Sequence, residues 1–205
     1  MRASTRRIAV PGPVGRIECA IDAPPDAARA VALIAHPHPL YGGTLDNKVV
    51  QTLARTFVDL GYAAVRPNFR GVGASEGQHD AGAGEVDDLA AVLGHARAEF
   101  GAAPAVLAGF SFGAAMQVLL AQRLAASEVE RLVLVGVAVT RLALPAVAKG
   151  TLLIHGERDE TVPLAAVLDW ARPQDLPVVV VPGADHFFHR RLQSLRDIVR
   201  GAWGA

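Results

Sequence analysis

A serine lies at the centre of residues 109–113, which read GFSFG and match the motif G-x-S-x-G. An apolar run over residues 105–108 leads into the motif, and a segment of helical periodicity over 113–125 follows it. A serine on a tight turn between a strand and a helix projects its hydroxyl from the sheet edge, as nucleophilic acyl transfer requires. Such a turn strains the serine backbone, and the flanking glycines allow strand and helix to approach closely. We therefore predict that Ser111 is a nucleophile.

A second match to the same motif, residues 73–77 with Ser75 at its centre, serves as an internal comparison. It lies in a polar, glycine-rich loop over 68–84, with no strand immediately before it and no helix immediately after it. It also lacks the Lys-Ser/Thr ending of a phosphate-binding loop. We interpret this second match as a structural turn.

A serine hydroxyl needs a base to take its proton, and the base needs a third group to hold its tautomer. In one chain order of such a triad, an acid and then a histidine follow the serine, each at the end of a strand. The strand predicted over 151–155 is followed by Glu157, Asp159 and Glu160. We take Asp159 as the acid, with Glu157 and Glu160 as alternatives that we interpret as a solvated loop face.

The strand predicted over 177–181 is followed by two histidines, His186 and His189. His186 comes first after the turn, and we take it as the base. His189 lies three residues further along, in the following helix, where a structural or surface role is the preferred interpretation.

An oxyanion hole needs two backbone N–H groups, one of which is expected from Phe112, the residue after the nucleophile. The other is expected from the loop after the strand predicted over 30–35. Proline has no N–H, which excludes Pro37 and Pro39 and leaves His38, Leu40 and Tyr41. We choose His38.

The spacing of His36 and His38 could instead hold a metal, because alternate residues of a strand share a face. No paired cysteines and no H-E-x-x-H accompany these histidines. Local hydrogen bonding by His36 is the preferred interpretation, and we predict neither a metal nor a cofactor.

Apolar strands alternate with helical segments along the chain, which predicts an α/β fold with a mostly parallel sheet covered on both faces. The first two strands form a hairpin. The predicted strands are 8–11, 16–21, 30–35, 62–67, 105–108, 132–138, 151–155 and 177–181, and the predicted helices are 47–61, 85–100, 113–125, 164–171 and 190–203.

The composition fits one soluble domain over residues 1–205. Lys+Arg and Asp+Glu both number 20, so the charge balance predicts no nucleic-acid partner. No apolar stretch approaches the roughly 20 residues of a membrane helix, and the N-terminal apolar run is too short for a secretory signal. The single cysteine, Cys19, cannot form an internal disulfide, which favours a reducing, cytoplasmic location.

Together these motifs resemble the α/β-hydrolase superfamily, in particular its small, cap-less, dienelactone-hydrolase-like bacterial members. The resemblance implies an eight-stranded sheet, hydrolysis by a Ser-His-Asp triad, no cofactor and a structural role for Arg70 and its neighbouring glycines. The oxyanion loop, which commonly reads His-Gly in that family, reads His36-Pro37 here. The matching stretches are His36-Pro37, Gly42-Gly43, Asn47-Lys48, residues 68–73, residues 109–113, His155-Gly156, Asp159, Val162-Pro163 and residues 186–188.

In that family a lid is commonly inserted between the sixth and seventh strands, but residues 139–150 leave no room for one. We therefore expect an open site whose substrate-binding rim includes Leu40, Tyr41, Phe110 and Phe187, with Leu142 or Leu144 as further candidates. Some of these apolar residues could instead belong to the core, Phe110 first among them. Such a site favours an enzyme that cleaves small or short-acyl carboxylic esters through an acyl-enzyme. The alternatives are a non-catalytic binding module, or the same triad acting on thioesters, lactones or peptides. The expected partners are the small-molecule ester and, in a homodimer, a second copy of the chain.

Overall fold

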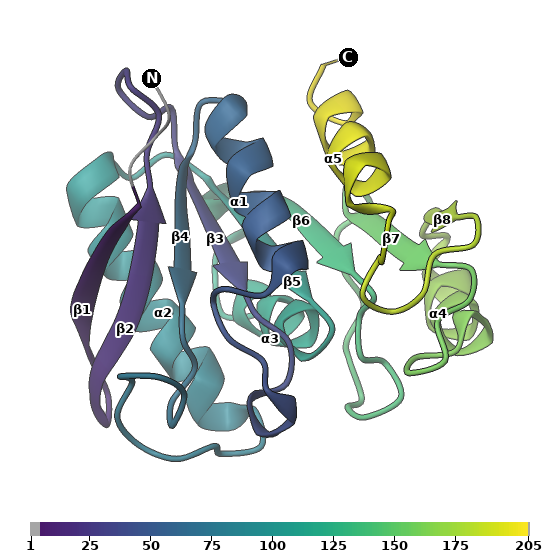
Figure 1. Cartoon of the computed structure of the whole chain (residues 1–205), viewed down its shortest axis with the longest axis horizontal. Helices are drawn as coiled ribbons and strands as arrows, with labels where there is room; N and C mark the ends of the chain where they lie inside the picture. Colours follow the sequence, from purple (N-terminus) through teal and green to yellow (C-terminus); the bar gives the residue numbers. More distant parts are fainter. Residues whose placement is uncertain (1–4, 205) are drawn as a thin grey trace.

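The computed structural model describes residues 5–204, and within them the strands form one eight-stranded sheet (Figure 1). The strand order is β1-β2-β4-β3-β5-β6-β7-β8. β1 and β2 form an antiparallel hairpin, β2 is antiparallel to β4, and all later pairs are parallel. The strands are β1 Arg6–Gly12, β2 Gly15–Asp22, β3 Val31–Ala35, β4 Ala63–Pro67, β5 Ala105–Phe110, β6 Val129–Val135, β7 Leu152–Gly156 and β8 Val178–Val181.

Helices cover both faces of the sheet. One face packs against α1 (Lys48–Asp59) and α5 (Leu192–Gly201), and the other against α2 (Ala83–Phe100), α3 (Phe112–Ala121) and α4 (Leu164–Ala171). The predicted fold class is therefore confirmed. The carboxyl ends of the parallel strands lie at the lower edge in Figure 1, whereas the C-terminal end of α5 lies at the upper edge.

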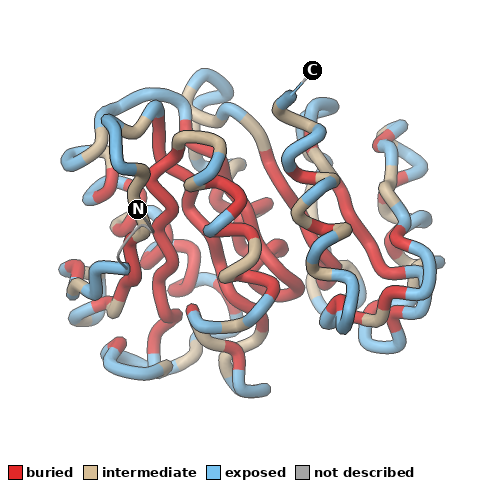
Figure 2. The backbone as a smooth tube through the Cα atoms, turned by 45° about the horizontal axis from the view of Figure 1, so that its top comes forward, coloured by how far each residue is buried: buried red, intermediate tan, exposed pale blue. Residues whose placement is uncertain are grey.

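The central strands form the core of the molecule. Every residue of β3, β4 and β5 is buried, because helices cover both of their faces (Figure 2). The helices instead bury one stripe, as in α1, where Val50, Leu53 and Phe57 face the sheet. This packing fixes the positions of the strand ends that precede Ser111, Asp159 and His186.

Some element boundaries differ from those predicted. The helix predicted over 113–125 ends as α3 at Ala121, and a short 3-10 helix, Ala126–Glu128, follows it. β6 starts and ends three residues before the predicted strand 132–138, and its end coincides with Gly136, which takes a positive φ of 53°. Helix α2 begins at Ala83 because the Glu85 carboxylate accepts a hydrogen bond from the Gly82 N–H.

The connection between β6 and β7 contains no helix or strand, so the fold carries no lid domain. The chain returns directly from the end of β6 to the start of β7, as expected from the sequence. The loops at the carboxyl ends of the strands are therefore left uncovered by any further layer.

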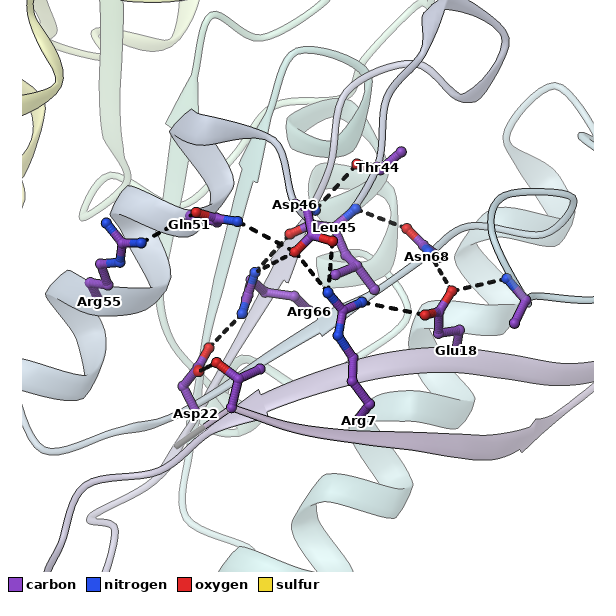
Figure 3. A network of polar contacts seen from close by, with 12 residues as sticks. Arg7, Glu18, Asp22, Thr44, Leu45, Asp46, Gln51, Arg55, Arg66 and Asn68 are labelled. Carbon is purple, nitrogen blue, oxygen red and sulfur yellow. Dashed lines mark hydrogen bonds and ion pairs between the residues drawn. The ribbon is translucent and has the colours of Figure 1, made fainter. Parts of the chain in front are cut away.

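A network of charged and amide side chains ties the hairpin to the segment that leads into α1 (Figure 3). Arg7 on β1 binds the Asp46 carboxylate at 2.7 and 2.9 Å. Arg66 on β4 binds both Asp22, at 2.7 Å, and the carbonyl oxygen of Leu45, at 2.8 Å. Leu45 and Asp46 follow the loop after β3, so the network anchors that loop to the sheet.

Candidate active site

Ser111 lies between the last residue of β5 and the first residue of α3, with φ 56° and ψ −117°. A positive φ is unfavourable for a residue with a Cβ and costs about 1–3 kcal/mol. The neighbouring glycines allow this turn. A Cβ on Gly109 would lie 2.6 Å from the backbone N of Ala114, and one on Gly113 would lie 2.4 Å from the carbonyl oxygen of Ala35. The turn that the sequence predicted is therefore confirmed as a local structure.

The side chains of Ser111, His186 and Asp159 form a continuous hydrogen-bonded line. Nε2 of His186 lies 3.0 Å from Oγ of Ser111, and Nδ1 of the same ring lies 2.7 Å from Oδ2 of Asp159. The two alternative acids, Glu157 and Glu160, are exposed, and Glu157 instead accepts a hydrogen bond from the Gly183 N–H. This arrangement can move a proton from the hydroxyl to the imidazole while the carboxylate holds the ring.

Backbone N–H groups of the loop after β7 bind the oxygen of the Asp159 carboxylate that does not contact His186. Oδ1 accepts hydrogen bonds from the N–H groups of Thr161 and Val162, at 2.9 and 2.8 Å. His155 has no role predicted from the sequence, and it is fully buried beside this loop. Its Nε2 lies 2.9 Å from the Val162 carbonyl oxygen and 3.4 Å from Asp159 Oδ2. Burial lowers the pKa of His155, which favours a neutral ring that donates to the loop.

The ring of His186 packs on two aromatic side chains, with ring centroids 4.8 Å from Phe110 and 5.2 Å from Phe187. His189, the alternative base, is exposed and binds the Asp185 carboxylate at 2.6 Å instead. His186 is therefore the histidine that the structure brings to Ser111.

Of the three candidate N–H groups in the loop after β3, two are bound to His38 and one has no partner within the described residues. His36 is buried, with Nδ1 2.6 Å from the Pro37 carbonyl oxygen and Nε2 accepting from the Phe69 N–H at 3.0 Å, so its local hydrogen bonding is confirmed. The N–H groups of Leu40 and Tyr41 are both bound to His38, through its Nδ1 and its carbonyl oxygen. The N–H of His38 itself makes no hydrogen bond to protein in the part of the chain that the structure describes.

The N–H of Phe112 is the first in α3, where it has no intrahelical acceptor. The rings of Phe112 and His38 lie 4.9 Å apart, so the two predicted donors come from adjacent segments. Both lie beside Ser111 in the wall of one pocket.

A pocket of about 260 Å³ opens at Ser111, and loops after five strands contribute to it. It is smaller than the range of roughly 300–1,000 Å³ usual for ligand sites, which suits a small molecule. Its lining residues are His38, Tyr41, His79, Ala81, Ser111, Phe112, Ala138, Arg141, Leu142, Thr161 and Val162. Sequence reasoning missed His79, Arg141 and Thr161 because no motif marks them.

Three of the four predicted rim residues do not line this pocket, and one of them, Phe110, is corrected because it has no exposed surface. Phe110 is fully buried, because adjacent residues of an extended strand point to opposite faces and its ring lies behind His186. Leu40 is 68% exposed at the outer side of the 3-10 turn Pro39–Tyr41. Phe187 is 46% exposed beside His186, outside the pocket. Tyr41 lines the pocket as predicted.

The loop between β4 and α2 supplies His79 to the pocket. Its Nδ1 lies 2.6 Å from Oε1 of Glu85, which is fully buried. Although burial opposes ionisation of Glu85, hydrogen bonds from the backbone N–H groups of Asp80 and Gly82 contribute to a lowered pKa. Glu85 therefore holds the His79 ring as a carboxylate.

Two residues singled out in the sequence are structural. The Ser75 hydroxyl donates to the Asn68 carbonyl oxygen at 2.8 Å and accepts from the Glu18 N–H at 2.9 Å, so the second G-x-S-x-G match is a turn, as predicted. Arg70 binds both oxygens of the buried Asp88 at 2.8 Å. A Cβ on Gly84 would lie 1.8 Å from the Arg70 guanidinium, so this pair requires that glycine.

Among residues 5–204, no cluster of three or more His, Cys, Asp or Glu side chains could bind a metal ion. Across the same range, no helix has the length and apolar character to span a membrane.

Comparison with known proteins identifies the family of the chain. The family model described as "Serine aminopeptidase, S33" matches residues 28–149. An uncharacterized protein of Rickettsia prowazekii is 33% identical over 205 residues, which cover 92% of this chain and 84% of that protein.

Among solved structures, an α/β serine hydrolase homologue from Coxiella burnetii is 40% identical, with a TM-score of 0.88 over 96% of each chain. An α/β serine hydrolase without a lid from Xanthomonas campestris is 37% identical, with a TM-score of 0.89 over 98% of this chain and 94% of that one. The chain therefore belongs to the α/β-hydrolase superfamily, as one of its serine hydrolases without a lid.

Proposed function

We propose that the protein hydrolyses small carboxylic esters, with Ser111 as nucleophile, His186 as general base and Asp159 as the group that orients His186. The observation that carries this proposal is the line of hydrogen bonds from Ser111 Oγ through the His186 ring to Asp159, at 3.0 and 2.7 Å. Ser111 lines a pocket, so a substrate carbonyl can reach its hydroxyl.

In the first step, Ser111 Oγ attacks the ester carbonyl carbon while His186 Nε2 takes the hydroxyl proton. The carbonyl oxygen gains negative charge, which the N–H groups of Phe112 and His38 stabilise. When the tetrahedral intermediate collapses, the bond to the alcohol oxygen breaks. His186 then donates its proton to that oxygen, and the alcohol leaves.

In the second step, water attacks the acyl-enzyme and His186 takes a proton from it. The same two N–H groups stabilise the second tetrahedral intermediate. The bond to Ser111 Oγ breaks, the serine regains a proton from His186, and the carboxylic acid is released. In both steps the Asp159 carboxylate compensates the charge of the protonated ring.

The pocket favours small or short-acyl substrates, since its volume is about 260 Å³ and no lid provides a longer apolar channel. In a series of 4-nitrophenyl esters, kcat/KM is expected to be highest for acyl chains of about two to four carbons and to fall for longer ones. A maximum at long acyl chains would contradict the size argument.

The pocket lining favours esters over the peptides that an aminopeptidase cleaves. An aminopeptidase binds a free α-ammonium group, for which carboxylates are suited. None of the residues that line the pocket is acidic, whereas three are His or Arg. We therefore expect 4-nitrophenyl esters to react faster than aminoacyl 4-nitroanilides.

A fluorophosphonate probe tests the nucleophile, because it labels only an activated serine. The wild type should be labelled, and Ser111→Ala should lose both labelling and ester hydrolysis. Ser75→Ala is the matched control, since Ser75 has the same motif but binds only backbone groups. Labelling that persists in Ser111→Ala would assign the reactive hydroxyl to another serine. A wild type that is neither labelled nor active would favour a non-catalytic binding module.

We place this activity in the cytoplasm. Cys19 is a free, buried thiol, and a fold without a disulfide is suited to a reducing compartment.

A further inference from the structure

The pocket beside Ser111 is lined by three basic side chains, His38, His79 and Arg141. They come from the loops after β3, β4 and β6, so separate segments of the chain converge on one small space. The proposed reaction uses the backbone N–H of His38 but neither of the other two side chains. A neutral ester carries no negative charge that these basic side chains would bind.

Arg141 is an exposed residue in the wall of the pocket, and among the described residues no carboxylate pairs with it. Its guanidinium makes no ion pair within residues 5–204, whereas Arg66 and Arg70 each bind a carboxylate. The acids closest to the site are already bound, Asp159 to His186 and Glu85 to His79. Arg141 is therefore available to a ligand in the pocket.

His79 presents a fixed ring to the same pocket. Because Nδ1 is bound to Glu85 at 2.6 Å, only Nε2 remains to contact a ligand. Glu85 in turn is held by the backbone N–H groups of Asp80 and Gly82, both at 2.9 Å. The ring is thus positioned before a ligand binds, which lowers the entropic cost of binding.

The three basic groups share one electrostatic environment. Burial lowers the pKa of His38, and the nearby charges of His79 and Arg141 lower it further. An anion in the pocket would relieve this mutual repulsion. None of the other side chains that line the pocket is acidic, so none competes with an anion for Arg141.

We propose that Arg141 and His79 form an anion subsite in this pocket, and that the substrate is a small ester that carries a carboxylate. This inference rests on the proposed esterase function and adds the substrate class. The guanidinium of Arg141 binds the carboxylate through paired N–H groups, and Nε2 of His79 contacts it from the loop after β4. The ester group of the same molecule lies at Ser111.

Matched pairs of substrates test the subsite. Mono-4-nitrophenyl succinate and 4-nitrophenyl butyrate place a carboxylate or a methyl group at the end of acyl chains of equal length. A second pair, 4-acetoxybenzoate and its methyl ester, places the charge on the leaving group. The ratio of kcat/KM for the anionic and the neutral ester is measured in each pair, and the rate with Ser111→Ala is subtracted as the spontaneous reaction.

The wild type should prefer the anionic ester in at least one pair. Arg141→Ala should lower that preference by about 10- to 100-fold, the size expected for a hydrogen bond to a charged group, and Arg141→Lys should restore part of it. Arg200→Ala is the matched control, since Arg200 is an exposed arginine in the last turn of α5, at the opposite edge of the sheet (Figure 1). It should keep the wild-type preference.

Salt gives a second readout. The preference of the wild type should fall as the ionic strength rises from about 0.01 to 1 M, because the Debye length shrinks from about 30 to 3 Å. A wild type that hydrolyses the neutral esters through Ser111 but shows no anionic preference in either pair would overturn the subsite and leave the esterase proposal standing. The same holds if Arg141→Ala leaves the preference unchanged. Failure of Ser111 to react with any ester or with the fluorophosphonate would overturn both.

Discussion

Acid should destabilise the fold through His36, the buried histidine at the start of the loop after β3. Its Nδ1–H donates to the Pro37 carbonyl oxygen, and its Nε2 accepts from the Phe69 N–H. Protonation would remove the Nε2 lone pair and bury a charge. Burial lowers the pKa of His36 from 6.5 to about 4, although the hydrogen bond to Pro37 partly opposes this shift.

The direction of the effect follows from proton uptake by the two states. Below pH 6.5 the unfolded chain protonates this histidine, while the folded protein does not do so until about pH 4. The unfolded state therefore binds more protons in this window, and the free energy of unfolding falls as the pH falls. The change in pKa from 6.5 to about 4 corresponds to about 3 kcal/mol in all, of which about 2 kcal/mol is lost between pH 7 and 5.

Urea unfolding of the wild type and of His36→Gln at pH 7 and pH 5 measures this term. Glutamine can donate and accept hydrogen bonds but does not titrate, so the variant should lose about 2 kcal/mol less than the wild type between the two pH values. His155, whose pKa burial also lowers, acts in the same direction and is present in both proteins. Between pH 7 and 8.5 the two proteins should show the same pH dependence. Equal losses from pH 7 to 5 would refute the argument.

Three further substitutions test the site and its support. Asp159→Asn should lower kcat by about 10⁴-fold with the fold retained, because the amide cannot hold the His186 tautomer that accepts the serine proton; steady-state kinetics and circular dichroism measure both. Gly113→Ala should destabilise the protein by about 1–3 kcal/mol in urea unfolding, because its Cβ would lie 2.4 Å from the carbonyl oxygens at the end of β3. Arg70→Met should cost about 3–5 kcal/mol in the same assay, because it leaves the Asp88 carboxylate buried without its partner.

The sequence predicts well what depends on chain order and strand ends. Strands alternate with helices, so the sheet, its two helical layers and the turn at Ser111 follow from local patterns. Asp159 and His186 were chosen because each follows a strand, and parallel strands bring their carboxyl ends to one edge. The lid is absent because the connection between β6 and β7 is short, which a count along the chain reveals.

What the sequence does not predict depends on loop conformations set by tertiary contacts. His79 reaches the pocket because a buried Glu85 holds its ring, and no local pattern distinguishes Glu85 from a surface acid in the first turn of a helix. Arg141 lies in a loop without regular structure, where no periodic pattern predicts which way a side chain points. Phe110 was misassigned because the motif marks the residue's place in the chain and not the face to which its ring points.

The contacts that strain Ser111 also fix its place relative to the proposed oxyanion donors. Gly113 lies against the carbonyl oxygens of Ala35 and His36, so the first turn of α3 packs directly on the end of β3. Gln117, one turn further along α3, is fully buried and donates to a carbonyl oxygen of β3 at 2.9 Å and to one of β5 at 3.0 Å.

These contacts join the backbone that carries the nucleophile to the backbone that leads into the loop of His38. Backbone contacts cannot relax by a change of rotamer, so the separation of the two segments is set when the sheet and α3 pack. The strain at Ser111 is therefore offset by packing that would exist without any of the three proposed catalytic side chains. For this reason Gly113→Ala should reduce catalysis even where the hydrogen bonds among Ser111, His186 and Asp159 persist, because it displaces the hydroxyl from the N–H groups that bind the developing charge.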